Sequence, residues 1–199
     1  MKNKGVLYAL CAGISWGISL GIFGRTMTSF GFTAMQVSAV RTTISAITFI
    51  ILALVTDRKA FRLNPKDIWI FLCSGFISVT LFCWCYFTST RLCSLAVGGV
   101  LQYTAPVWVV VFSAVIFKEP ITKVKAAAMV IAIAGCVLVS GITHGVGQVS
   151  AFGLIAGVFS GITYGSYTIF TRFAVPKYRT MTINVYTFIV ASATSLLLS

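Results

Sequence analysis

Acidic residues are almost absent from this sequence, and charge of either sign is scarce. Three aspartates and glutamates stand against 15 lysines and arginines in 199 residues, and charged residues amount to 9% of the chain. A soluble domain draws about a quarter of its composition from charged side chains, because it needs a polar shell around its core. The shortage therefore argues against a soluble globular protein.

Histidine and grouped metal ligands are scarce as well. The chain has one histidine, His144, and six cysteines that lie within or near apolar segments. Cys83 and Cys85 flank Trp84, but no histidine stands near them to complete a metal site. The cysteines are therefore expected to pack as small hydrophobes, and we expect neither a metal nor a cofactor.

A catalytic group of residues is missing too. Residues 13–17 have the Gly-x-Ser-x-Gly spacing of a nucleophile elbow, the turn that presents the serine of some hydrolases. That chemistry needs a histidine and a carboxylate beside the serine, and the single histidine falls in a predicted outer loop. We therefore expect no enzyme, and an intramembrane enzyme is the least supported alternative.

Apolar runs, by contrast, are abundant. Hydrophobic residues make up 58% of the chain and gather in seven segments that approach or reach the roughly 20 residues a helix needs to cross a bilayer core. These segments are 5–23, 34–55, 68–87, 95–117, 124–142, 152–170 and 183–198. The sequence thus predicts an all-α membrane protein, a multi-span helical bundle embedded in the lipid bilayer.

The basic residues lie between these segments and indicate the orientation of the chain. With the N-terminus inside, twelve of the 15 lysines and arginines fall in cytoplasmic segments, and only Arg25 and Arg91 fall outside. Positive residues concentrate on the cytoplasmic side of membrane proteins. We therefore predict a multi-pass protein of the cell inner (plasma) membrane with a cytoplasmic N-terminus. Because the positive charges form no helical face, we expect no nucleic-acid partner.

Two parts of the chain repeat each other. At an offset of 148 residues, Gly-Ile-Ser-Trp-Gly at 13–17 matches Gly-Ile-Thr-Tyr-Gly at 161–165. The first repeat therefore contains five spans, and an odd number reverses the orientation of the second copy. The sequence predicts inverted five-helix repeats, a complete one over 5–142 and a partial one of about two spans over 152–199. The chain is therefore expected to be truncated within its second repeat.

The order of features in the first repeat resembles a known family. A turn of a small residue and a proline at 105–107 precedes an apolar run, Lys-Glu-Pro-Ile-Thr at 118–122 closes that run, and Gly135 lies in the next span. Together with Trp16 in the first span and Arg41 in the second, this order resembles the EamA-type repeat of the drug/metabolite transporter (DMT) superfamily.

The resemblance implies ten spans in a full-length protein, both termini inside and a central cavity between the two repeats. Substrates of this family range over amino acids, metabolites, nucleotide sugars and drugs. We therefore expect a secondary permease that works by alternating access on a small-molecule solute. The alternative is a truncated, non-transporting fragment or half-unit that needs a partner, either a second copy in a homodimer or a complementing chain.

Three side chains within the spans are candidates for solute contact. Arg41 is the charged residue well inside a span, which makes it a functional candidate by default; the alternative is an arginine that snorkels to the outer interface. Trp16 and Tyr164 occupy matching positions in the two repeats. If the repeats face each other, this pair flanks the central cavity; otherwise the two rings pack against neighbouring helices or lipid.

The fourth span carries a predicted helix break. Pro106 removes a helix hydrogen bond, and Gly98 and Gly99 loosen the helix before it. Freed carbonyls are tolerated at membrane depth only where they face protein or a wet cavity. We therefore place polar solute contacts at Gln102 and Tyr103 and give the break a gating role; a purely structural kink is the alternative.

Glycines four residues apart form a row in the first and in the sixth segment. Small residues at this interval let helix backbones approach closely, so we predict a helix-packing face in both segments. In an alternating-access transporter, the same faces would slide or rock. The residues are Gly13, Gly17 and Gly21 in the first row, and Gly157, Gly161 and Gly165 in the second.

Overall fold

The computed structural model describes residues 2–139 and 150–199, and every regular element within them is helical. Within these described residues, six helical stretches are long and apolar enough to cross a membrane. They are Gly5–Ser29, Ala34–Thr56, Pro65–Leu92, Leu95–Phe117, Ala151–Ala174 and Thr180–Leu197. The expected all-α membrane fold is confirmed, whereas the inverted relation between two repeats stays a prediction.

The expected fifth span corresponds to α8 (Lys123–Val139), which the structure describes over 17 residues. Its expected end at residue 142, like His144, lies outside the described residues. The connection before α8 begins at Lys118, whose left-handed φ of 55° ends the preceding helix. The loop after the second span is shaped by two short 3-10 helices, η2 (Arg58–Phe61) and η3 (Pro65–Asp67).

Polar cap residues decide where two of the spanning helices begin. Thr33 and Gln36 form a reciprocal capping box at the start of α3 (Ala34–Thr56). The Ser94 side chain accepts a hydrogen bond from the first turn of α6 (Leu95–Gln102). These bonds satisfy backbone N–H groups that have no partner within the helix, and they thereby stabilise an abrupt helix start near a membrane surface.

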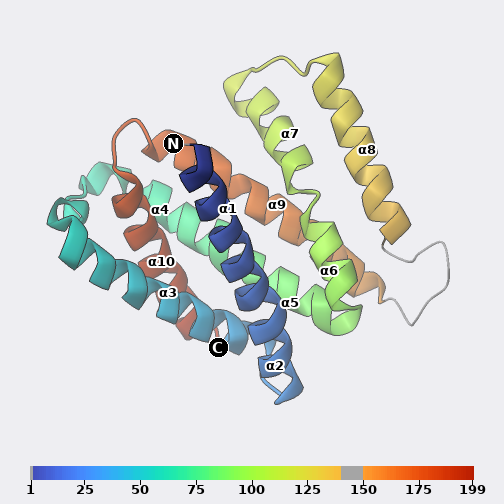
Figure 1. Cartoon of the computed structure of the whole chain (residues 1–199), viewed down its shortest axis with the longest axis horizontal. Helices are drawn as coiled ribbons and strands as arrows, with labels where there is room; N and C mark the ends of the chain where they lie inside the picture. Colours follow the sequence, from blue (N-terminus) through green and yellow to red (C-terminus); the bar gives the residue numbers. More distant parts are fainter. Residues whose placement is uncertain (1, 140–149) are drawn as a thin grey trace.

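The last two helices lie against the helices that precede them in the chain (Figure 1). α9 (Ala151–Ala174) packs against α5 (Phe82–Leu92), α6 and α7 (Ala105–Phe117). α10 (Thr180–Leu197) packs against α3 and α4 (Ile68–Gly75). Residues of the two predicted repeats therefore meet inside a single bundle.

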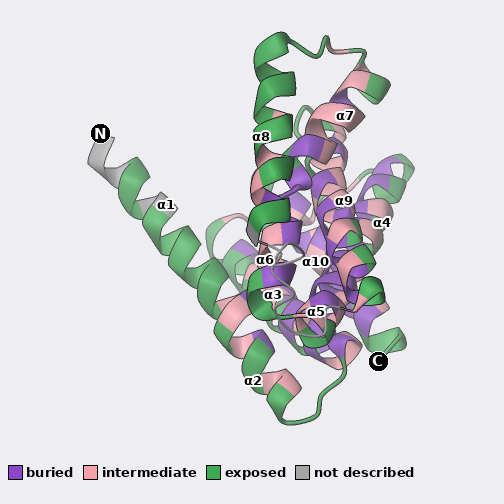
Figure 2. Ribbon diagram, turned by 90° about the vertical axis from the view of Figure 1, so that its right-hand side faces the viewer, coloured by how far each residue is buried: buried purple, intermediate pink, exposed green. Residues whose placement is uncertain are grey.

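Among the six candidate spans, the first helical stretch is the least buried. α1 (Lys2–Trp16) continues through the π-helical segment η1 (Gly17–Phe23) into α2 (Gly24–Ser29). Figure 2 shows α1 extending away from the other helices, with exposed residues along its length. Leu10 and Ile14 of α1 are 59% and 63% exposed, which fits a helix whose neighbour is lipid.

Hydroxyl side chains join α10 to the neighbouring helices. Between membrane helices there is little hydrophobic drive, so packing and such hydrogen bonds hold the bundle together; each bond contributes about 0.6 kcal/mol on average. The pairs are Ser38 with Ser195 (3.2 Å), Thr43 with Ser192 (2.8 Å), Ser74 with Thr187 (2.9 Å) and Thr80 with Thr194 (2.8 Å), measured between hydroxyl oxygens.

Candidate functional site

Arg41 points from α3 into the interior of the bundle and is only 9% exposed. Its Nε donates a hydrogen bond to Ser19 Oγ at 2.9 Å, and its Nη1 donates one to Cys83 Sγ at 3.0 Å. The guanidinium carbon lies 5.7 Å from the centroid of the Trp16 ring, within cation–π range. Of the two positions that the sequence left open, Arg41 takes the interior one, while its role stays a prediction.

Both helices that supply these partners depart from α-helical geometry beside Arg41. Ser19 lies within η1, and Cys83 follows closely after a second π-helical segment, η4 (Phe76–Leu81). The π-helix replaces the i→i+4 bonds with i→i+5 bonds, and short π segments inside α-helices occur frequently at functional sites. The geometry around Arg41 therefore depends on a local irregularity in each of two helices.

The two aromatic residues that the repeat pairs together are in direct contact. The rings of Trp16 and Tyr164 meet edge to face, with centroids 5.6 Å apart. Tyr164 also packs against Phe82, with ring centroids 5.1 Å apart. Because Trp16 approaches Arg41 as well, the rings and the guanidinium form one group that joins α1, α3, α5 and α9.

A cavity of about 250 Å³ lies beside this group, and we call it the Arg41 cavity. Aromatic rings dominate its wall, and Arg41 is the charged residue among those that line it. At one side, Tyr167 Oη donates a hydrogen bond to Asn184 Oδ1 at 3.2 Å. The lining residues are Trp16, Arg41, Phe49, Ser78, Val79, Phe82, Tyr164, Tyr167, Asn184 and Phe188.

A second cavity of about 330 Å³ shares Trp16 and Tyr164 with the first. Gln102, Tyr103 and Pro106 line it from the α6–α7 side. The residues predicted for solute contact therefore line two cavities that share one aromatic pair. Gln102 is buried, whereas Tyr103 is 70% exposed, so the two polar residues beside the helix break have different surroundings.

The helix break itself lies at residues 103–104, between the end of α6 and the start of α7. Pro106 is the second residue of α7, a position where the missing N–H costs no helix hydrogen bond. Gly98 packs against Thr90 so closely that a Cβ there would collide with it, whereas Gly99 faces open space. The gating role predicted for these residues stays a prediction.

The two glycine rows differ in their surroundings. In the α9 row, a Cβ on Gly157 would collide with Leu101, and one on Gly161 would collide with Thr104. Gly165, at the end of that row, lies against the backbone of Ala105. This row therefore allows α9 to approach the α6–α7 break. Around Gly13, Gly17 and Gly21 a Cβ would meet nothing within 4 Å, so packing through the first row stays a prediction.

All three carboxylates of the chain lie at one end of the bundle, away from the Arg41 cavity, and pair with basic residues around the α9–α10 loop. None of them lines either cavity. The pairs are Asp57 with Arg179 (2.9 Å), Asp67 with Lys177 (2.6 Å) and Glu119 with Arg172 (2.6 Å), measured between nitrogen and oxygen atoms.

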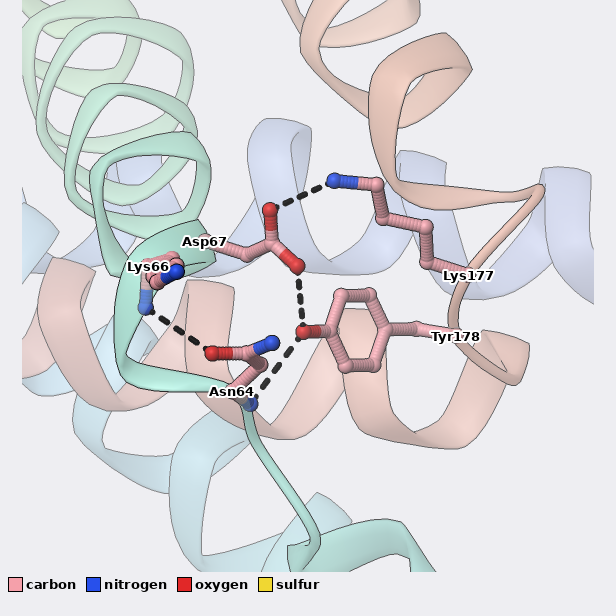
Figure 3. Close-up of polar contacts among 5 residues, drawn as sticks. All are labelled: Asn64, Lys66, Asp67, Lys177 and Tyr178. Atoms are coloured by element: carbon pink, nitrogen blue, oxygen red, sulfur yellow. Dashed lines mark hydrogen bonds and ion pairs between the residues drawn. The ribbon is translucent and has the colours of Figure 1, made fainter.

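The Asp67 pair is part of a larger polar contact between two loops (Figure 3). Tyr178 Oη donates a hydrogen bond to Asp67 Oδ2 at 2.8 Å and accepts one from the backbone N–H of Asn64 at 3.2 Å. Lys177 and Tyr178, which are neighbours in the α9–α10 loop, thus both contact the α3–α4 loop. This contact connects the two loops through side chains and backbone together.

Ion pairing shifts the pKa values of charged side chains in these loops. The hydrogen bond from Arg179 lowers the pKa of Asp57 below its ordinary value of 3.8. The hydrogen bond to Asp67 raises the pKa of Lys177 above its ordinary value of 10.5. Both shifts favour the ionised forms, so the loops stay paired across neutral pH.

Sequence reasoning missed several residues of the Arg41 group. Ser19 and Cys83 are small side chains in apolar runs, and nothing in the sequence indicates the π segments that bring them to Arg41. Asn184 and Tyr167 carried a usable signal, because an amide within an apolar span is unusual and tends to find a polar partner. Applied to Asn184, the reasoning that singled out Arg41 finds this residue too.

Comparison with known proteins agrees with the geometry. The model of the EamA-like transporter family matches residues 3–141, which is more than half of the chain. No curated protein and no solved structure gives a significant match. The family match covers the helices that carry Trp16, Arg41 and Pro106. It also covers part of the set of six apolar helices, which are typical of a multi-pass membrane protein. The chain therefore belongs to the EamA-like transporter family.

Proposed function

We propose that the protein is a secondary transporter that carries a small organic solute through the Arg41 cavity by alternating access. The observation that carries this proposal is the meeting, at one cavity, of Arg41 with the rings of Trp16 and Tyr164. A charged side chain inside a membrane protein is costly to bury and commonly marks a solute or ion pathway. Members of the family are transporters, which supports the same conclusion.

Alternating access needs a closure that opens reversibly at each end of the pathway. At one end, the α3–α4 loop is held to the α9–α10 loop by the pairs Asp57–Arg179 and Asp67–Lys177. The two loops belong to different predicted repeats, so opening this end separates both pairs. The basic partner of each pair is exposed to solvent, and ion pairs at a surface contribute little net stability, which suits a closure that opens in every cycle.

The end that carries these pairs faces the cytoplasm in our proposal. Twelve of the 15 basic residues fall on that side when the N-terminus is inside, in agreement with the excess of positive charge in cytoplasmic loops. The protein then lies in the cell inner (plasma) membrane. No carboxylate of this chain lies in mid-span, so the proposed cycle uses no Asp or Glu proton relay within it.

Solute exchange by the purified protein in liposomes tests this function. Liposomes loaded with one unlabelled solute from a panel of organic anions, cations, zwitterions and neutral compounds are diluted into the same solute in labelled form. We expect uptake of one class by the wild type and none by Arg41→Ala. The matched control is Arg25→Ala, which removes the same side chain from an exposed position at the end of the first helical stretch.

Folding of each variant is checked by size exclusion and by thermal unfolding in detergent. Uptake by the wild type that Arg41→Ala retains in full contradicts the role of the cavity. A folded wild type that takes up no solute of the panel contradicts transport by this chain alone. If uptake then appears with a second, complementing chain, the half-unit alternative replaces our proposal.

A further inference from the structure

Resting on the function proposed above, we propose that the Arg41 cavity recognises a small organic anion: a carboxylate on a flat apolar or aromatic body, without a compensating ammonium group. The argument begins with charge. Arg41 is 9% exposed, and the groups it contacts, Ser19, Cys83 and the ring of Trp16, are all neutral. A guanidinium buried among neutral groups is expensive unless an anion compensates it.

The chain supplies no such anion from its own side chains. Its three carboxylates, Asp57, Asp67 and Glu119, are all paired with basic residues at the loop end of the bundle. A solute that brings a carboxylate therefore supplies the charge that Arg41 lacks. Binding of that solute and neutralisation of the buried cation are then the same event.

The geometry of the guanidinium suits a carboxylate. An arginine has five N–H donors in a planar fork that matches a carboxylate with two parallel hydrogen bonds. The hydrogen bonds found within the described residues account for the Nε donor and one donor on Nη1. Because Arg41 also lines the cavity, its remaining donors are available to a ligand there.

The wall of the cavity defines the rest of the solute. Tyr164 and Phe82 pack at a tilt on one side, with ring centroids 5.1 Å apart, and Phe49 and Phe188 stack on another, with ring centroids 5.2 Å apart. Flat apolar groups pack well against such rings. A volume of about 250 Å³ limits the solute to a small molecule. No carboxylate lines the cavity, so an ammonium group on the solute would face Arg41 without compensation.

Four compounds that share one ring test these features on the full-length wild type in detergent. Benzoate carries the anion, benzyl alcohol is neutral, benzylamine is a cation and phenylalanine is a zwitterion. Calorimetric titration is expected to show benzoate binding at least about tenfold more tightly than each of the others, as charge-assisted hydrogen bonds allow. Equal or tighter binding of benzylamine or phenylalanine overturns the proposal, and this comparison needs no variant.

Arg41→Gln provides the second measurement. It is expected to bring benzoate affinity down to that of benzyl alcohol, a loss of about tenfold or more, while Arg25→Gln leaves benzoate affinity unchanged. Inorganic phosphate and anionic lipid are tested as competitors in nanodiscs. Competition by either one as strong as that by benzoate shows a general anion or headgroup site and overturns recognition of the apolar body.

The outcome separates this inference from the proposed function. Selective benzoate binding without exchange in liposomes supports the anion site and contradicts transport. Exchange of a cationic or neutral solute through an Arg41-dependent pathway, with no benzoate selectivity, supports transport and contradicts the anion site.

Discussion

Arg41 is held inside the bundle by several weak partners rather than by one strong one. A hydroxyl, a thiol and an indole ring each contribute a fraction of what a carboxylate would contribute. Such partners orient the guanidinium without neutralising it. The side chain is therefore preorganised for an anion, because its direction is fixed while its charge remains uncompensated.

The contact with Cys83 predicts a measurable difference between two substitutions at that residue. Cys83→Ala removes the acceptor for Arg41 Nη1 and is expected to lower the free energy of unfolding by about 1–3 kcal/mol, since a buried donor is left without a partner. Cys83→Ser keeps an acceptor of similar size and is expected to lose less. Thermal or denaturant unfolding in detergent compares the two.

A control separates this effect from loss of sulfur packing. Cys73, on α4, is half-buried and lines an apolar pocket whose wall does not include Arg41. Cys73→Ala and Cys73→Ser are expected to show the reverse order, with serine the worse tolerated in an apolar environment. If serine and alanine at residue 83 give equal stabilities, the hydrogen bond contributes nothing.

At the scale of single residues, the sequence singled out Arg41, Trp16 and Tyr164 as candidates for solute contact but did not predict their contacts with one another. A charge in an apolar run is visible, and so is a pair of aromatics at a repeat offset. The partners Ser19 and Cys83 depend on backbone irregularities that no residue pattern marks. Their roles as solute contacts stay predictions.

At the scale of elements, the glycine row of α9 and the break between α6 and α7 fit each other. Gly161 lies against Thr104, one of the two residues of the break. Ala105, which follows the break, touches Gly165. A helix with larger side chains would hold α6 and α7 farther from α9. Close approach of α9 to the break thus follows directly from the residue size along one helix face.

This fit predicts opposite effects of alanine at two repeat-related glycines. Gly161→Ala is expected to destabilise the protein by about 1–3 kcal/mol, because its methyl group collides with Thr104 in a closely packed contact. Gly13→Ala, at the matching position of the first row, is expected to be neutral or to stabilise by up to about 1 kcal/mol through helix propensity. Unfolding in detergent measures both, and equal losses would contradict the asymmetry.

The spanning helices themselves could largely be predicted, because hydrocarbon as a solvent demands long apolar runs. The expected 34–55 and 95–117 agree closely with the described Ala34–Thr56 and Leu95–Phe117. The stretch expected at 68–87 extends over Pro65–Leu92 instead. Its ends carry polar and charged residues that hydropathy assigns to loops, whereas backbone hydrogen bonding continues the helix through them.

At the scale of the whole molecule, the contacts between the α3–α4 and α9–α10 loops join the two predicted repeats. We expect Arg179→Asp to place like charges together at Asp57 and to slow solute exchange, since the closure no longer forms properly. The double variant Asp57→Arg with Arg179→Asp restores the opposite charges and is expected to recover much of the rate. A double variant no better than the single one would show that the pair is incidental.

The pKa shifts of these loops predict the pH range over which the closure holds. The pKa of Asp57 is lowered, so its contribution is present above its ordinary pKa and is lost as the pH falls through the lowered value. The pKa of Lys177 is raised, so its contribution is present below its ordinary pKa and is lost as the pH rises through the raised value.

Between about pH 5 and about pH 9 the stability difference between the wild type and Asp57→Asn is therefore expected to stay constant, and it is expected to shrink below about pH 4. Thermal unfolding in detergent over this range checks the expectation. If the stability difference between the wild type and Asp57→Asn changes steadily between about pH 5 and about pH 9, another titrating group controls the closure.

The arrangement of the whole molecule could be predicted only in outline. Charge bias and repeat spacing predict how the chain crosses the membrane and which loops share a side. They do not predict that Asp57, Asp67 and Glu119 would all pair with residues around the α9–α10 loop. Such pairings depend on the packing of α9 and α10, which is held by hydroxyl contacts and glycine size rather than by charge.

The central claim is that solute passes through the Arg41 cavity, and covalent blockage of that cavity tests it most directly. Ser78 lines the cavity and is replaced by cysteine in a variant whose native cysteines are changed to serine. After a bulky maleimide modifies Ser78→Cys, exchange in liposomes is expected to stop, and excess solute is expected to slow the modification. A cysteine at exposed Thr122 is the control. Full exchange by the modified Ser78→Cys protein would contradict the account.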